Sequence, residues 1–246
     1  MAPPILPSAW QVPATIRNRL GSRVGRQRPM AAEGHLLLVL HAPPKPDDTD
    51  RVGRFFWRNP QGDWLSKDLG SGIRALGLHI DEFEDLLNKL DREEAQANTI
   101  EDYFRVLEQL APIHRTVRNL YQVLQEARQL CPDDREILNM RDRAYALERS
   151  AELLFQETKN SLDFRMAKQA EVQARAAERM VVAQHRLNML VAFFFPIATL
   201  TTIFGVNLQH GYENRYVPNL FLGTIAVGLA LGIVLTLFIA RRPRSR

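Results

Sequence analysis

Two apolar segments near the C-terminus decide the fold: LNMLVAFFFPIATLTTIF (187–204) and VPNLFLGTIAVGLALGIVLTLFIA (217–240). The turn Gly205-Val206-Asn207 and a short polar loop separate them. About 20 helical residues cross the hydrocarbon layer of a bilayer, so each segment is long enough to span it. The sequence therefore predicts a two-helix transmembrane hairpin over 187–240, with Asn207 at its tip.

Basic residues predict the orientation of this hairpin. Arg175, Arg179 and Arg186 precede the first segment, and the tail 241–246 holds four more arginines. The connecting loop carries only Glu213 and Arg215 as charged residues. Because basic residues are retained on the cytoplasmic side, we expect a multi-pass protein of the cell's inner (plasma) membrane with both termini in the cytoplasm. The first 33 residues lack the apolar core of a secretory signal.

The composition argues against several classes of protein. A net charge of +4 gives little support to a nucleic-acid partner. The single cysteine, Cys131, excludes an intrachain disulfide framework and a cysteine-based metal cluster. The sequence shows neither a glycine-rich phosphate loop nor a nucleophile, histidine and acid constellation. We therefore expect a protein that is not an enzyme and needs no cofactor.

The N-terminal third lacks long helical patterns. Residues 1–33 are rich in Pro, Arg and Gly without periodicity, which predicts a disordered basic tail. Its arginines could contact anionic lipid; a solvated tail without a role is the alternative. Residues 34–71 predict a small β-rich segment with short strands at 35–40, 54–57 and 63–65, the last two joined as a hairpin.

Residues 72–186 predict a cytoplasmic helical and stalk region. Apolar residues recur with helical spacing from residue 73 to 90, and Thr99 is a candidate N-cap for the next helix. Pro112 should kink or break that second helix. No Gly or Pro occurs between Pro132 and Pro196, which predicts one helix of about 95 Å.

This long helix carries a stripe of apolar and small residues near heptad spacing. The stripe comprises Ile137, Met140, Ala144, Leu147, Ala151, Leu154 and Thr158, and Ala167, Ala170, Ala174 and Ala177 continue it. Such a stripe predicts packing on the 99–131 helix and, as a coiled coil, on copies of the same chain. A monomeric helical hairpin is the alternative. The expected fold class is mainly α, with a small N-terminal α/β region.

Together these features resemble the CorA-type divalent metal-ion transporters. The resemblance depends on the long helix, the aromatic-proline element Phe194-Phe195-Pro196, and Gly205-Val206-Asn207 in place of the family's usual Gly-Met-Asn. It implies a homopentamer whose first spans line a pore and whose second spans form an outer ring. Five Asn207 carboxamides would then receive a hydrated Mg²⁺ at the outer mouth. Mg²⁺ loses water reluctantly, so neutral oxygens that hold it through its waters would let it leave again.

On this resemblance, one face of the first span should line the pore. Counting back from Asn207 in steps of three to five residues selects Thr202, Ala198, Phe195, Val191, Leu187 and Gln184. An apolar middle suits a constriction that gates by dewetting. Packing of Phe195 and Val191 against the second span is an equally open alternative. The hydroxyls of Thr199, Thr201 and Thr202 could either face water or bond back to the helix.

The departures from the family pattern leave the transported ion open among Mg²⁺, Zn²⁺, Co²⁺ and Ni²⁺. Valine replaces the central methionine, and Glu213 is the only acidic residue of the outer loop. We expect passive Mg²⁺ uptake through a homo-oligomeric pore, with a divalent cation and membrane lipid as partners. The alternative is a membrane-anchored coiled-coil scaffold or regulated effector pore that has lost selective transport.

Overall fold

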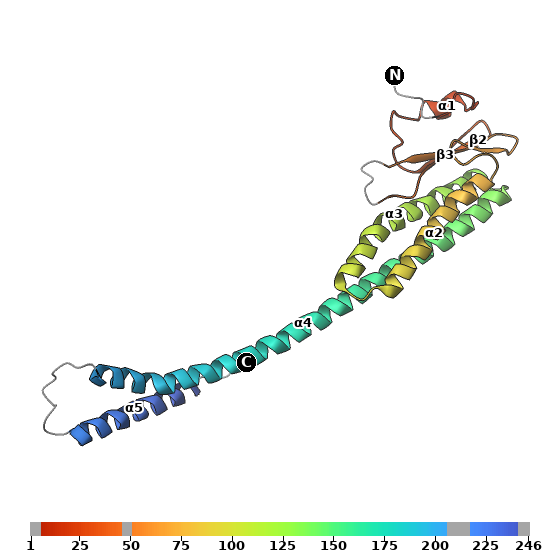
Figure 1. The fold of residues 1–246 in the computed structure, drawn as a ribbon. Coiled ribbons are helices and arrows are strands. Elements are labelled where there is room, and N and C mark those ends of the chain that lie inside the picture. The colour runs from red at the N-terminus through yellow and green to blue at the C-terminus, as the bar shows by residue number, and fades with distance from the viewer. Residues whose placement is uncertain (1–5, 46–50, 206–216, 241–246) are drawn as a thin grey trace. The chain divides into compact units, whose positions relative to one another are not determined.

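The structure is a computed structural model that describes residues 6–45, 51–205 and 217–240. It is mainly helical with a small N-terminal strand region, as expected (Figure 1). The chain divides into two compact units, an N-terminal unit (1–167) and a C-terminal unit (168–246). The elements are α1 (Ala14–Arg17), β1 (Arg28–Ala32), β2 (His35–His41), β3 (Gly53–Arg58), β4 (Trp64–Ser66), α2 (Arg74–Gln96), α3 (Ile100–Leu130), α4 (Arg135–Gly205) and α5 (Val217–Ala240).

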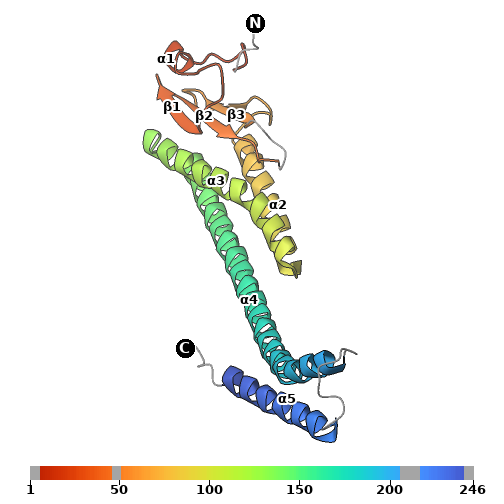
Figure 2. The ribbon, with the colours of Figure 1, turned by 90° about the vertical axis from the view of Figure 1, so that its left-hand side faces the viewer.

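The N-terminal unit is built on an antiparallel sheet in the order β1-β2-β3-β4. Alternate residues of a strand face opposite sides, and β2 is buried on both. Leu36, Leu38 and Leu40 pack into the main core with α2, α3 and α4, whereas Leu37 and Val39 pack into a second core. Figure 2 shows the helices on one side of the sheet and the segment with α1 on the other.

The prediction of a disordered tail is wrong for residues 6–33. Leu6, Trp10 and Ile16 are buried in the second core, and β1 adds a fourth strand to the three that the sequence indicated. The Arg17 guanidinium donates hydrogen bonds to the Val12 carbonyl (3.1 Å) and the Trp10 carbonyl. The irregular spacing of these apolar residues gives no periodic signal, but the open face of the sheet requires a cover. The segment supplies that cover.

The helices of this unit begin and end close to the predicted positions. Thr99 caps α3 as expected: its hydroxyl accepts from the Asp102 amide at 3.2 Å, and the Asp102 carboxylate accepts from the Thr99 amide at 3.0 Å. Of the two outcomes predicted at Pro112, a break is wrong, because α3 is one helix from Ile100 to Leu130; a kink there stays a prediction. Leu110 and Ile113, which flank the proline, are both buried in the main core, so packing holds the helix together there.

The first part of the α4 stripe is buried inside this chain. The residues Ile137, Ala144, Leu147, Ala151, Leu154 and Thr158 are all buried, and Met140 packs against the same core. The alanines that continue the stripe, Ala167, Ala170, Ala174 and Ala177, are all exposed. The stripe to Thr158 therefore packs on the chain's own helices, and the coiled coil between copies stays a prediction for the later part.

Ion pairs fix the start of α4. One Asp134 oxygen accepts from the amides of Glu136 (2.9 Å) and Ile137 (3.2 Å), which caps the helix. Its other oxygen accepts from the Arg58 guanidinium of β3 at 2.7 Å. Further along, Arg143 pairs with Asp81 (2.5 Å) and Glu84 (3.0 Å) of α2. These contacts connect α4 to both the sheet and α2.

A buried histidine lies where β3 meets α2. His79 is completely buried between the rings of Phe56 and Phe83, and Arg54 donates to its Nδ1 at 3.1 Å. The proton of the neutral ring is therefore on Nε2, which has no hydrogen-bond partner within the described ranges. Burial, followed by the charge of Arg54, lowers the pKa of His79 to about 3.

This histidine predicts acid sensitivity of the N-terminal unit. The unfolded chain takes up the His79 proton below about pH 6.5, whereas the folded chain does so only near a pKa of about 3. The free energy of unfolding should therefore fall as pH drops from 6.5 toward 3. Thermal unfolding at pH values of about 7.5 and about 5.5, on either side of the ordinary histidine pKa, tests this. His79→Leu should reduce the pH dependence, and His185→Gln, at an exposed position, should leave it unchanged.

Candidate functional site

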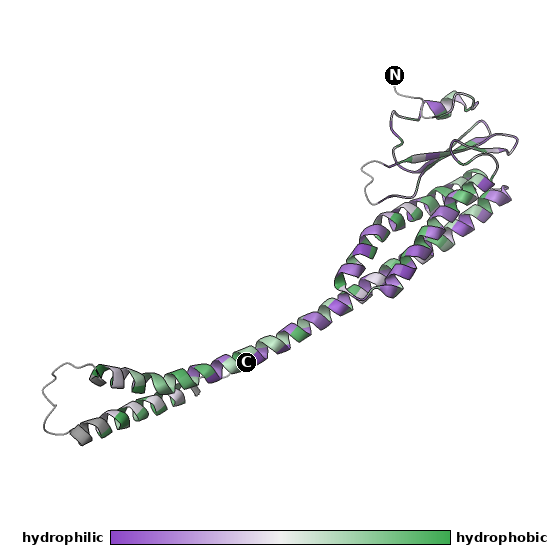
Figure 3. Cartoon of the chain, viewed as in Figure 1, coloured by the Kyte–Doolittle hydropathy of each residue, from purple (hydrophilic) through white to green (hydrophobic). Residues whose placement is uncertain are grey.

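The C-terminal unit contains the apolar helices. Among the described residues, α4 is the one helix that is long and apolar enough to cross a membrane, and the apolar run of α5, Leu222–Phe238, is shorter. Figure 3 shows apolar residues along α5 and the C-terminal part of α4. α4 continues through Pro196 and ends at Gly205. Of the two predicted spans, the one in α4 is thus long and apolar enough to cross a membrane.

α5 packs against α4 through two glycines. Gly228 and Gly232 are buried; a Cβ at Gly228 would lie 3.2 Å from the Ile197 Cα, and one at Gly232 would lie 2.5 Å from the Phe193 carbonyl oxygen. Gly232 lies four residues after Gly228 on α5, whereas its contact Phe193 lies four residues before Ile197 on α4. The two helices are therefore antiparallel. Small residues at this spacing allow helices to approach closely. We did not predict this contact from the sequence, although G-x-x-x-G in an apolar segment signals it.

This contact defines which face of α4 is covered. Phe193 and Ile197 face α5. Phe195 lies two residues from each of them, which places it on the opposite side of a helix with 3.6 residues per turn. The side chain of Phe195 is 65% exposed and that of Val191 is 53% exposed. Within the chain, the alternative that these two residues pack against the second span is therefore wrong.

The structure brings all six predicted pore residues onto one open face. Gln184, Leu187, Val191, Phe195, Ala198 and Thr202 are each exposed, and they recur at intervals of three or four residues. The face points away from α5. The threonine hydroxyls bond back to the helix: Thr199 to the Phe195 carbonyl (2.8 Å), Thr201 to Ile197 (2.8 Å) and Thr202 to Ala198 (2.7 Å). The Thr202 oxygen still has acceptor capacity toward the open face.

Charge is confined to the other side of α4. Between residues 168 and 203 the charged residues are Lys168, Glu171, Arg175, Glu178, Arg179 and Arg186. Their helical spacing places all of them on the half that carries Phe193. The open face continues toward the N-terminus through Gln184, Met180, Ala177 and Gln173, which are uncharged. This segment therefore has one charged side and one uncharged side.

The predicted outer mouth lies outside the described residues. Gly205 is the last residue of α4, and Val206, Asn207 and Glu213, like the tail 241–246, fall in the ranges that the structure does not describe. Among the described residues, no group of three or more His, Cys, Asp or Glu side chains could hold a metal ion. The amide site at Asn207 stays a prediction.

A family model described as CorA-like Mg²⁺ transporter protein matches residues 63–242. The chain belongs to this family. It is accordingly a transporter-type protein and not an enzyme; it needs no cofactor, and a divalent cation is its transported substrate.

Two solved structures are similar to the chain. The full-length CmaX protein shares 17% identity with a TM-score of 0.47, over 85% of this chain and 77% of that one. The complete CorA magnesium transporter from Methanocaldococcus jannaschii shares 15% identity with a TM-score of 0.45, over 89% and 82%. No curated protein matches the chain.

Proposed function

We propose that the chain is one subunit of a homopentamer that conducts Mg²⁺ passively into the cell along α4. The observation that supports this most is the open, uncharged face of α4 opposite α5. That face carries the carboxamide of Gln184 and the hydroxyl of Thr202 at its two ends. The Thr202 hydroxyl donates to the Ala198 carbonyl but can still accept a hydrogen bond, and water or protein would supply the donor that hydrocarbon lacks. Copies that meet with these faces inward supply both.

The hairpin length agrees with a two-span topology. α5 has 24 residues, which at 1.5 Å per residue is about 36 Å and exceeds the roughly 30 Å of a hydrocarbon core. α4 supplies the first span from Leu187 to Gly205. With arginines before the first span and after the second, both termini are cytoplasmic in the inner membrane.

The open face suits permeation by a hydrated cation. Leu187, Val191 and Phe195 form an apolar middle that can gate by dewetting, and Thr202 lies near the outer end. Five Asn207 carboxamides would hold Mg²⁺ through its waters at the mouth, with Gly205 allowing the turn. An inside-negative potential drives entry by about 2.3 kcal/mol per charge per 100 mV, so no energy-coupling site is required.

A second candidate function is a membrane-anchored scaffold or effector pore without selective transport. Two observations favour it: the N-terminal unit has only four short strands among its described residues, and the signature reads Gly-Val-Asn. A scaffold would keep its assembly and lose nothing when Asn207 is replaced. A transporter would lose Mg²⁺ uptake or ion selectivity.

Phe195→Ala is expected to raise Mg²⁺ flux several-fold, because it widens the apolar constriction. Flux into vesicles that contain the purified protein and a Mg²⁺-sensitive dye measures this. Phe193→Ala is the matched control: it removes the same ring from the side that contacts α5, and we expect flux that is equal or lower. An increase with Phe193→Ala, or an unchanged flux with Phe195→Ala, would count against the proposed lining.

A further inference from the structure

The charged side of α4 carries arginines just before the membrane segment. Arg175, Arg179 and Arg186 are exposed and lie four and seven residues apart, on the side that seven residues later carries Phe193. Phe193 contacts α5. The arginines therefore lie on the α5 side of the helix, away from the open face.

Two of these arginines have no partner among the residues that the structure describes. Arg175 donates to the Glu171 carboxylate at 2.5 Å. Arg179 and Arg186 form no ion pair or hydrogen bond with any described residue. A guanidinium group with no partner among the described residues is available to pair with an external phosphate.

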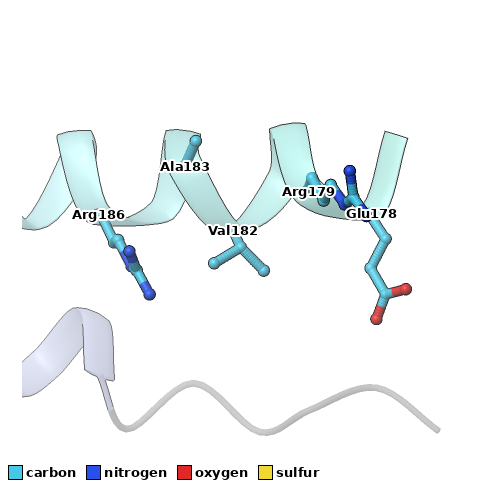
Figure 4. Close-up of a pocket in the computed structure, with 5 residues that line it drawn as sticks. All are labelled: Glu178, Arg179, Val182, Ala183 and Arg186. Atoms are coloured by element: carbon cyan, nitrogen blue, oxygen red, sulfur yellow. The ribbon is translucent and has the colours of Figure 1, made fainter. Parts of the chain in front are cut away.

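A shallow hollow of about 400 Å³ lies on this side of α4 and is lined by Glu178, Arg179, Val182, Ala183 and Arg186. Figure 4 shows Arg186, Val182 and Glu178 projecting from the same side of the helix, with Ala183 on the opposite side. Glu178 lies two turns from Arg186, at the other end of the hollow. Two arginines against one glutamate leave the hollow with a net positive charge. Val182 provides an apolar contact between the charged groups.

The helix register places Arg186 at the cytoplasmic end of the hairpin. Phe193 pairs with Gly232 and Ile197 with Gly228, so each residue back along α4 corresponds to one residue forward along α5. Seven residues before Phe193, Arg186 is level with the last turn of α5. Arg179 is about 10 Å further from the membrane. In the orientation of the proposed function, this is the level of the lipid headgroups.

We propose that Arg186 and Arg179 bind the headgroup phosphates of anionic phospholipids in the cytoplasmic leaflet. This inference depends on the orientation in the proposed function but not on ion conduction. Guanidinium groups pair with phosphate oxygens through two parallel hydrogen bonds. A basic residue near an anionic membrane surface gains about fivefold in affinity, which corresponds to about 1 kcal/mol. The lipid contacts the outside of the assembly, and the uncharged face is left to the ion.

The test measures lipid selectivity of the full-length protein in phosphatidylcholine vesicles. Trace spin-labelled phosphatidylglycerol or phosphatidylcholine reports the fraction of each lipid that is immobilised on the protein. The wild type should prefer phosphatidylglycerol, and Arg179→Gln with Arg186→Gln should reduce this preference about fivefold or more. Arg186→Lys should retain most of it. An unchanged preference in the double variant would overturn the proposal.

Two further measurements distinguish lipid binding at these arginines from a general charge effect and from the binding of free anions. Lys168→Gln removes the same charge from the same side of α4, about 27 Å before Arg186, and should leave the preference unchanged; an equal loss there would show only a general charge effect and overturn the site. Excess inorganic phosphate should not abolish the preference; if it did, the arginines would bind free anions and the lipid proposal would be overturned. Mg²⁺ flux in the same vesicles tests the proposed function separately, because lipid selectivity does not require conduction.

Discussion

Gly232→Leu is expected to separate α5 from α4 and to reduce Mg²⁺ flux by about tenfold or more. Even a Cβ at this position would lie 2.5 Å from the Phe193 carbonyl oxygen. One turn earlier on α5, a Cβ at Gly228 would lie 3.2 Å from the Ile197 Cα. Because the clash is with backbone, no rotamer change relieves it, and overpacking of this kind costs about 1–3 kcal/mol or more. Flux in vesicles and the elution profile of the purified protein measure the effect.

Gly223→Leu is the matched control for this substitution. Gly223 belongs to the same helix, and a Cβ there would meet nothing within 4 Å in the described structure. Both substitutions gain helix propensity equally, so propensity cannot account for a difference between them. Normal assembly and flux in Gly232→Leu would contradict the glycine contact and, with it, the assignment of the open face.

Asn207→Ala is expected to abolish selective Mg²⁺ uptake while the protein still assembles. Removal of the carboxamide deletes the acceptors that would hold a hydrated Mg²⁺ at the outer mouth. Flux of Mg²⁺, Zn²⁺, Co²⁺ and Ni²⁺ into vesicles, with the wild type alongside, measures both rate and selectivity. We expect the preference for one ion over the other three to be lost.

The control for Asn207 is another asparagine of the same loop. Asn214→Ala removes an identical group seven residues later and should leave the flux unchanged. If the wild type itself shows no selective flux and both variants still assemble, the scaffold function is favoured over the transporter. If both variants transport normally, Asn207 is not the selectivity site. If both lose transport equally, the loop as a whole is required and Asn207 has no special role.

Much of the fold was predictable where local signals are strong. The absence of Gly and Pro after Pro132 predicted the long α4, and Thr99 with Asp102 predicted the start of α3. The N-terminal cover was not predictable, because Leu6, Trp10 and Ile16 follow no helical or strand period. Their burial depends on an open sheet face that exists only after β2 and β3 have paired.

In the candidate site, too, some features were predictable from the sequence and others were not. Counting at helical intervals from Asn207 selected six residues that do share an open face. Which face of α4 meets α5 could not be decided by hydropathy, because both helices are apolar on all sides there. That choice depends on Gly228 and Gly232, where only the backbone is small enough for Phe193 and Ile197.

The central claim is that the face of α4 opposite α5 borders water within the membrane. Reaction of single cysteines with a charged, membrane-impermeant thiol reagent tests it most directly. In a Cys131→Ser background, which has no other cysteine, Ala198→Cys should react and lose Mg²⁺ flux, whereas its neighbour Ile197→Cys should not. An unreactive Ala198→Cys, or a faster reaction at Ile197→Cys, would contradict the claim.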